Sequence, residues 1–137
     1  MAIAVDAMGG DRPLTVQVEA AVEAVKDFGI EVIIVGAEAQ INEQLKQYSY
    51  DQQNVRVVNS TEIVEMNESP ATALRQKKDS SIRVAIDLVK AGEADAVISA
   101  GNTGALMAMS KVVLRTLSNI DRPALIAPLP TINNKIR

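Results

Sequence analysis

The chain has 137 residues, 47% of them apolar, a formal net charge of −3, and no Cys, His or Trp. This composition excludes disulfides, a Ser-His-Asp triad and a zinc site of the His or Cys type within these residues. No apolar run reaches the ~20 residues that a membrane-spanning helix needs, and the N-terminus lacks the basic start of a signal peptide. We therefore expect one cytoplasmic α/β domain over residues 1–137, with an aliphatic core.

The charge is distributed unevenly along the chain. Residues 1–70 hold 4 basic and 12 acidic residues, a net charge of −8, whereas residues 71–137 hold 10 basic and 5 acidic residues, a net charge of +5. The isoelectric point of about 5.0 and the scarcity of aromatic side chains argue against a nucleic-acid partner. The positive excess in the second half is compatible with a small anionic ligand.

The first half alternates between buried strands and amphipathic helices. Continuous apolar runs predict the strands, and apolar residues at helical spacing predict the helices. Gly29 closes the first helix, which Pro13 opens in its first turn. In chain order the sequence predicts a strand over 2–7, a helix over 14–28, a strand over 31–36, a helix over 38–48 and a strand over 54–60.

The second half opens with an irregular stretch, residues 61–79, which has a short helix after Pro70. A helix follows that Asp79 or Ser80 caps and Gly92 ends. Three prolines make the last predicted strand an edge strand or a bend. The remaining predicted elements are a strand over 94–100, a helix over 103–117 with Ala105, Leu106, Met109, Val113 and Leu117 facing inward, and the proline-rich strand over 123–130.

This alternation predicts a parallel sheet with helices on both faces, a three-layer α/β/α fold. Ligands in such folds bind beyond the carboxyl ends of the strands. The first candidate site is therefore "DAMGGD", which follows the first strand. Gly9 and Gly10 allow close approach of the backbone, and Asp6 and Asp11 could position a polar ligand. A glycine turn in which Asp11 helps to cap the helix explains the same residues equally well, and no GxGxxG fingerprint is present.

The second candidate site is "SAGNTG", between the strand over 94–100 and the helix that follows. Backbone N–H groups at a helix start, together with the helix dipole, bind anions. Gly101 and Gly104 remove side-chain obstruction, and Ser99, Asn102 and Thr103 add neutral donors. A capped turn without a ligand is the alternative, but the motif exceeds what a cap needs. We favour a phosphate-type site.

A third feature is the basic run in "RQKKDSS". Arg75, Lys77 and Lys78 place three positive charges within four residues, and Arg122 is a fourth candidate near the end of the chain. A solvated loop is the usual explanation for such a run. If the loop folds over the strand ends, its charges meet the anion site. Phosphate held there could attack an activated carbonyl, a reaction that needs no protein nucleophile.

Three stretches together resemble the bacterial phosphate acyltransferases of phospholipid synthesis: "AVDAMGGD", "ALRQKKDSSIRVAIDLVKAGEADAVISAGNTGALMA" and "DRPALIAPLPT". The resemblance implies a fold similar to isocitrate/isopropylmalate dehydrogenases and the transfer of a fatty acyl group from acyl carrier protein to inorganic phosphate. It also implies a homodimer, peripheral membrane association and no cofactor.

The resemblance carries over to individual positions of this sequence. It implies that Lys78, Asn102 and Thr103 act on phosphate or on the thioester oxygen. The positions that would bind or shape the substrate site are Asp6, Gly9, Gly10, Asp11, Arg75, Lys77, Ser80, Ser99, Gly101, Gly104 and Arg122.

Relatives of this kind are more than twice as long, so the resemblance makes residues 1–137 an N-terminal part of a larger enzyme. An inactive fragment and a non-enzymatic anion-binding module are the alternatives. A dehydrogenase of related fold would show a nucleotide fingerprint, which is missing here. Lys111 and Arg115 are candidates for contact with the acidic carrier protein, although an ordinary solvated helix face is the better explanation for them.

Overall fold

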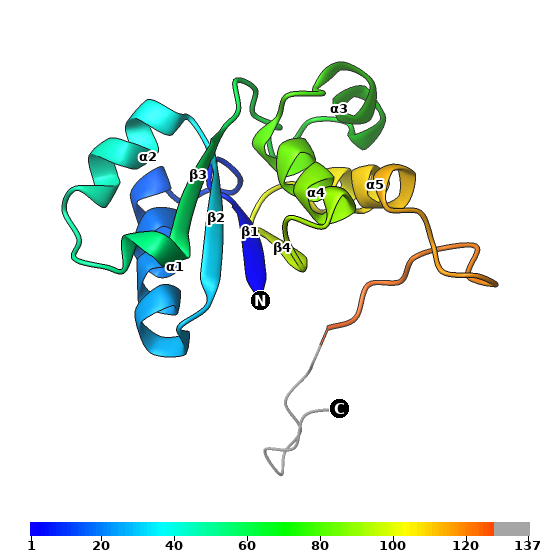
Figure 1. The fold of residues 1–137 in the computed structure, drawn as a ribbon. Coiled ribbons are helices and arrows are strands. Elements are labelled where there is room, and N and C mark those ends of the chain that lie inside the picture. Colours follow the sequence, from blue (N-terminus) through cyan, green and yellow to red (C-terminus); the bar gives the residue numbers. More distant parts are fainter. Residues whose placement is uncertain (128–137) are drawn as a thin grey trace, which may run out of the picture.

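The computed structural model describes residues 1–127 and contains one parallel sheet of four strands in the order β3-β2-β1-β4 (Figure 1). The strands are β1 (Ala2–Asp6), β2 (Glu31–Gly36), β3 (Val55–Asn59) and β4 (Ala96–Ser99). The helices are α1 (Leu14–Phe28), α2 (Glu38–Leu45), α3 (Pro70–Gln76), α4 (Ser81–Ala91) and α5 (Thr103–Val113), with a 3₁₀ turn η1 (Gln52–Asn54) before β3.

Helices cover both faces of the sheet, which confirms the predicted α/β/α layers (Figure 1). Val32 and Ile34 of β2 pack against α1 and α2 on one face. Ile33 and Val35 of the same strand pack against α4 on the other. Successive residues of a strand point to opposite faces, so β2 has to be apolar throughout, and all four side chains are buried.

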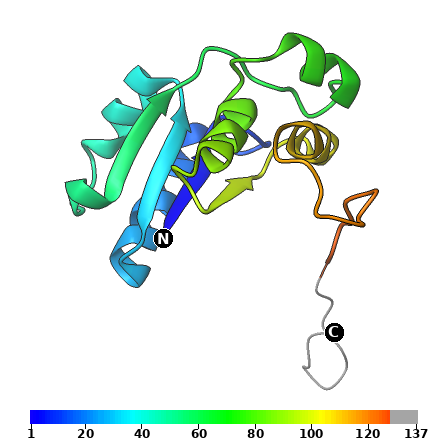
Figure 2. The same cartoon turned by 45° about the vertical axis from the view of Figure 1, so that its right-hand side comes forward.

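Helices α3, α4 and α5 gather at one side of the sheet (Figure 2). A third apolar cluster joins them. Ile82 and Ile86 of α4 meet Met109 of α5 and Ala73 of α3 in this cluster. Val64, from the segment between β3 and α3, is buried with them. The irregular stretch of the sequence is thus anchored to the core at Val64 and Ala73.

The structure corrects four predicted elements. Strand β4 covers Ala96–Ser99 instead of residues 94–100. Helix α5 ends at Val113, and Leu117, which we expected to face inward, is 82% exposed. The helix ends where the third cluster ends, because short helices depend on a packed face for their stability. Helix α2 likewise ends at Leu45. Residues 123–127 form no strand, and the rest of the predicted proline-rich strand lies outside the described residues.

Strand β4 lies at one edge of the sheet. It pairs with β1, and among residues 1–127 it has no second neighbour. Ile98 shares a face with Val5 of β1 and is 58% exposed beside α1. Within the same described residues, no helix is both long enough and apolar enough to cross a lipid bilayer.

Candidate functional site

The buried carboxylate of Asp6, at the end of β1, joins the two glycine-containing loops. Its Oδ1 accepts hydrogen bonds from the backbone N–H groups of Met8 (3.2 Å) and Gly9 (3.1 Å). Its Oδ2 accepts a hydrogen bond from the Ser99 hydroxyl at 2.7 Å, and that Oγ accepts the Gly101 N–H at 3.0 Å. The strand register places Asp6 level with Ser99. We call this arrangement the Asp6 knot.

Glycines are required where the two loops touch. A Cβ atom on Gly9 would lie 3.0 Å from the Cα of Gly101. Gly10 has a φ of 96°, and a Cβ there would lie 2.8 Å from the carbonyl oxygen of Ala100. Neither position leaves room for a side chain, and Gly10 also needs a backbone conformation that other residues adopt at a cost. The glycine pair therefore serves the contact between the loops.

Asp11 does not cap α1. Pro13 occupies the N-cap position, and the cap has no side-chain hydrogen bond. The Asp11 side chain is exposed instead. The interpretation of Asp11 as a helix cap is wrong, and its role in ligand binding stays a prediction.

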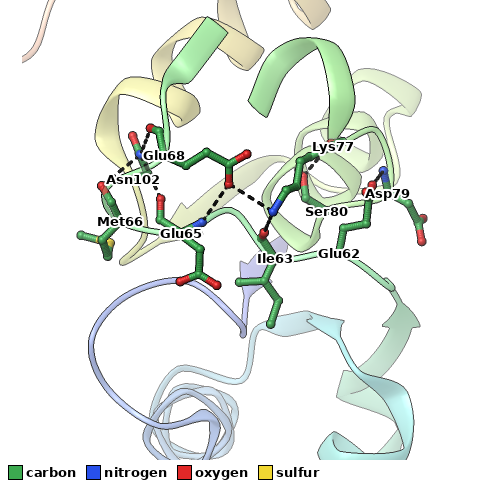
Figure 3. A network of polar contacts seen from close by, with 9 residues as sticks. All are labelled: Glu62, Ile63, Glu65, Met66, Glu68, Lys77, Asp79, Ser80 and Asn102. Carbon is green, nitrogen blue, oxygen red and sulfur yellow. Dashed lines mark hydrogen bonds and ion pairs between the residues drawn. The ribbon is translucent and has the colours of Figure 1, made fainter. Parts of the chain in front are cut away.

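Asn102 caps α5 as its residue type suggests, and it does more. Its Oδ1 accepts the Ala105 N–H at 3.0 Å. Its Nδ2 lies within hydrogen-bond distance of the carbonyl oxygens of Glu65 (3.2 Å), Met66 (3.2 Å) and Glu68 (2.9 Å), as Figure 3 shows. The buried amide therefore links the start of α5 to the segment before α3, some 35 residues earlier in the chain.

Two backbone donors remain open at the start of α5. Among residues 1–127, the N–H groups of Thr103 and Gly104 have no hydrogen-bond partner, and both residues are exposed. The first N–H groups of a helix have no acceptor within the helix and point along its axis, which makes them suited to an anion. Gly104 is also constrained on its other side, where a Cβ atom would lie 2.7 Å from Cγ of Pro70.

The three cations of the basic run differ in their contacts: one forms an ion pair, and two form none within the described residues. The Nζ of Lys77 pairs with the Glu68 carboxylate at 3.1 Å and donates to the carbonyl oxygen of Ile63. Arg75 and Lys78 are exposed and form no ion pair within the described residues. Ser80 is fully buried, and its hydroxyl donates to the carbonyl oxygen of Lys77 at 2.9 Å. Lys77 and Ser80 thus hold the loop in place.

Arg122 lies beside α5, and its place in an anion site stays a prediction. It lines a surface groove of about 280 Å³ together with Gly104 and Lys111. Met107 and Ala108 of α5 line the same groove. Two cations therefore flank an apolar stretch of α5 close to the open N–H groups.

Sequence reasoning missed the segment between β3 and α3. It treated residues 61–69 as irregular, yet Asp79 accepts hydrogen bonds from both the N–H and the hydroxyl of Thr61. The N–H of Asp79 in turn donates to the Glu62 carboxylate, as Figure 3 shows. The residue types in this segment do not indicate a site, because the rest of the protein contacts the segment mostly through its backbone carbonyl oxygens. Only the many polar residues in "TEIVEMNESP" indicated that this segment makes ordered polar contacts. Among residues 1–127, no group of three or more acidic, His or Cys side chains is placed to hold a metal.

Comparison with known proteins gives one family. A sequence profile of the family described as "fatty acid synthesis protein" matches residues 1–136. A phosphate acyltransferase of Legionella pneumophila (strain Corby) is 48% identical over 137 aligned residues, which cover 98% of this chain and 40% of the relative.

Two further relatives carry the same name. The phosphate acyltransferase of Geotalea uraniireducens is 50% identical over 135 residues, 98% of this chain and 39% of that protein. The one of Francisella philomiragia is 48% identical over 139 aligned positions, 96% of this chain and 40% of that protein. The chain therefore spans about two fifths of the length of these curated relatives. Because the profile match covers almost every residue, the chain belongs to the fatty acid synthesis protein family.

Proposed function

We propose that this chain supplies the phosphate-binding part of an enzyme that transfers a fatty acyl group from acyl carrier protein to inorganic phosphate. One observation carries the proposal: the unpaired N–H groups of Thr103 and Gly104, held beside the Asp6 knot, in a chain whose relatives are named phosphate acyltransferases. An anion at a helix start is stabilised by these donors and by the helix dipole.

The proposed roles follow from which groups are open. Thr103 and Gly104 hold phosphate oxygens through their backbone N–H groups, and the exposed Lys78 neutralises charge on the phosphate or on the thioester oxygen. Arg75 and Arg122 add positive charge around the site. The knot residues Asp6, Gly9, Gly10, Ser99 and Gly101 fix the neighbouring loop without touching substrate.

The proposed reaction is a single displacement at the thioester carbonyl. A phosphate oxygen attacks the carbonyl carbon, and a tetrahedral oxyanion forms that nearby donors stabilise. The carbon–sulfur bond then breaks, and its electron pair leaves with the carrier's thiolate, which takes up a proton. The products are acyl phosphate and free carrier protein. No nucleophile from the protein is required, because phosphate itself attacks.

The remaining parts of the proposal concern partners. Acyl carrier protein is acidic, and the exposed Arg75, Lys78 and Lys111 offer complementary charge for its approach. A homodimer, cytoplasmic location and peripheral contact with the membrane follow from the family resemblance alone.

Acyl-phosphate formation tests the proposal. We would compare the 137-residue chain with a chimera in which it replaces the matching two fifths of the Legionella enzyme. Turnover by the chimera that falls about tenfold or more in Lys78→Ala supports the role of this cation. Arg56→Ala is the matched control, because Arg56 pairs with Glu93 elsewhere on the surface. Wild-type rates in Lys78→Ala would remove Lys78 from the site.

A second candidate function is phosphate binding without catalysis. The observation in its favour is the pair of open N–H groups on Thr103 and Gly104, which can bind an anion without any catalytic partner. Phosphate binding by the 137-residue chain, combined with turnover only in the chimera, would assign binding to these residues and catalysis to the two parts together. Turnover by neither protein would contradict the acyltransferase proposal.

A further inference from the structure

Residues 61–69, which we call the strap, connect β3 to α3 and cross the side of the molecule near the start of α5 (Figure 3). Apart from one isolated bridge at Glu62, they form no regular secondary structure. They are nevertheless fixed: Val64 is buried in the third apolar cluster, and the first strap residues bond to the loop before α4. The strap is therefore a placed element whose far end has its own attachments.

Those attachments converge on Glu68. Its carbonyl oxygen accepts the Asn102 amide at 2.9 Å, and its carboxylate pairs with Lys77 at 3.1 Å. The carboxylate also accepts the Glu65 N–H at 3.3 Å. The side chains of Lys77 and Glu68 are 27% and 15% exposed, so water screens this ion pair less than it screens the other pairs on the surface. Asn102 and Lys77 thus both hold Glu68 in place, and we call these two side-chain contacts the fasteners of the strap.

The amide of Asn102 has no capacity left for a ligand. Its nitrogen carries two hydrogens and faces three carbonyl oxygens, and its oxygen accepts the Ala105 N–H. A phosphate oxygen could reach this nitrogen only by displacing a strap carbonyl. Its effect on an anion must therefore be indirect.

We propose that Asn102 is a positioning residue of the anion site: with Lys77 and Glu68 it holds the strap, and the strap sets the place of the open N–H groups and of Lys78. This inference rests on the proposed function. One packing contact and one chain connection transmit the position. Pro70, next to the strap, packs against Gly104, and Lys78 follows Lys77 directly in the chain.

The test compares phosphate affinity with strap mobility in the full 137-residue chain. Asn102→Ser keeps an oxygen that can cap α5 but loses the donors to the strap, without adding charge. Glu68→Gln breaks the ion pair at the other fastener, away from the α5 N–H groups. Glu93→Gln, which breaks the exposed Arg56–Glu93 pair, is the matched control. Titration with inorganic phosphate gives the Kd, and amide hydrogen exchange at residues 62–69 reports strap release.

We expect Asn102→Ser to weaken phosphate binding about tenfold and to speed exchange in the strap, while the helix content stays constant. Glu68→Gln weakens binding about threefold with the same exchange signature. Because both changes release one element, the double variant falls short of the product of the two effects. Glu93→Gln leaves both readouts unchanged.

Three outcomes would overturn the inference. Weaker binding in Asn102→Ser with no change in strap exchange would mean direct contact between Asn102 and the anion. Faster strap exchange with an unchanged Kd would mean that the strap does not serve the site. A wild-type chain that binds no phosphate would remove the proposed function and this inference together, a result that the wild-type titration alone separates from the other two.

Discussion

The Asp6 knot and the strap both hold backbone near the start of α5, but they do so by opposite means. In the knot, two loops come so close that Gly9 and Gly101 touch through their Cα atoms, around a carboxylate that is 2% exposed. In the strap, backbone carbonyl oxygens accept hydrogen bonds from the side chains of Lys77 and Asn102. The knot depends on missing side chains, and the strap depends on present ones.

The comparison teaches where substitutions should matter most. A clash between backbones cannot be relieved by a new rotamer, because nothing flexible lies between them. A lost side-chain donor on a part-exposed strap is replaced by water at modest cost. We therefore expect substitutions in the knot to affect global stability and substitutions in the strap to affect local order.

The largest effect is expected for Gly10→Ala. The new Cβ meets the carbonyl oxygen of Ala100, and the residue must keep a positive φ, so we expect a loss of about 3 kcal/mol in unfolding free energy. Gly29→Ala is the matched control, because Gly29 also has a positive φ but open space around it. It should lose about 1 kcal/mol. Urea denaturation measures both unfolding free energies. Equal losses in the two variants would show that the clash with Ala100 adds nothing to the cost of the positive φ.

Asp6→Asn is expected to come next, with a loss of about 2 kcal/mol. The amide accepts through one atom only, while three donors converge on the carboxylate, so one part-buried donor loses its acceptor. Thermal unfolding followed by circular dichroism is the measurement. An unchanged midpoint would mean that the two loops are held together without Asp6.

Ser99→Ala tests the bridge between the loops alone. It removes one donor to Asp6 and the acceptor for the Gly101 N–H, and we expect a loss of about 1 kcal/mol because Ser99 is only half-buried. Chemical denaturation again gives the value. A loss as large as that of Asp6→Asn would place the whole effect of the knot in this one hydroxyl.

The smallest effect on stability is expected for Glu68→Gln in the strap. The ion pair with Lys77 keeps some exposure, so its loss should lower the unfolding free energy by about 0.5 kcal/mol. Hydrogen exchange in residues 62–69 should change far more than the denaturation midpoint. A loss of stability comparable to that of Asp6→Asn would show that the strap is as integral to the fold as the knot.

The sequence predicts the layers well because they depend on local patterns. The apolar run of β2 and the helical spacing in α1 and α4 are visible without any partner, and glycines end both helices as expected. The end of α5 could not be predicted from the sequence. Its apolar spacing continues to Leu117, but Val113 is the last residue of the helix that packs in the third apolar cluster. An amphipathic pattern does not reveal how far its partner extends.

The candidate site divides in the same way. The glycine and hydroxyl pattern around Asn102 predicts a helix start with free donors, and the structure has both. The hydrogen-bond partners of the Asn102 amide nitrogen could not be predicted. They are the carbonyl oxygens of Glu65, Met66 and Glu68, which any residue type would provide. The same holds for Lys77. Its residue type gives its positive charge, but the sequence does not indicate that it pairs with Glu68.

Among residues 1–127 the outer edge of β4 is unpaired, and this has a consequence for handling the protein. The strand carries no charge and no proline over Ala96–Ser99, and its residue Ile98 is exposed. Edges of this kind act as templates for strands of other molecules. We expect concentrated solutions to be lost through slow edge-to-edge association well below the unfolding temperature, so storage concentration will limit experiments before heat does.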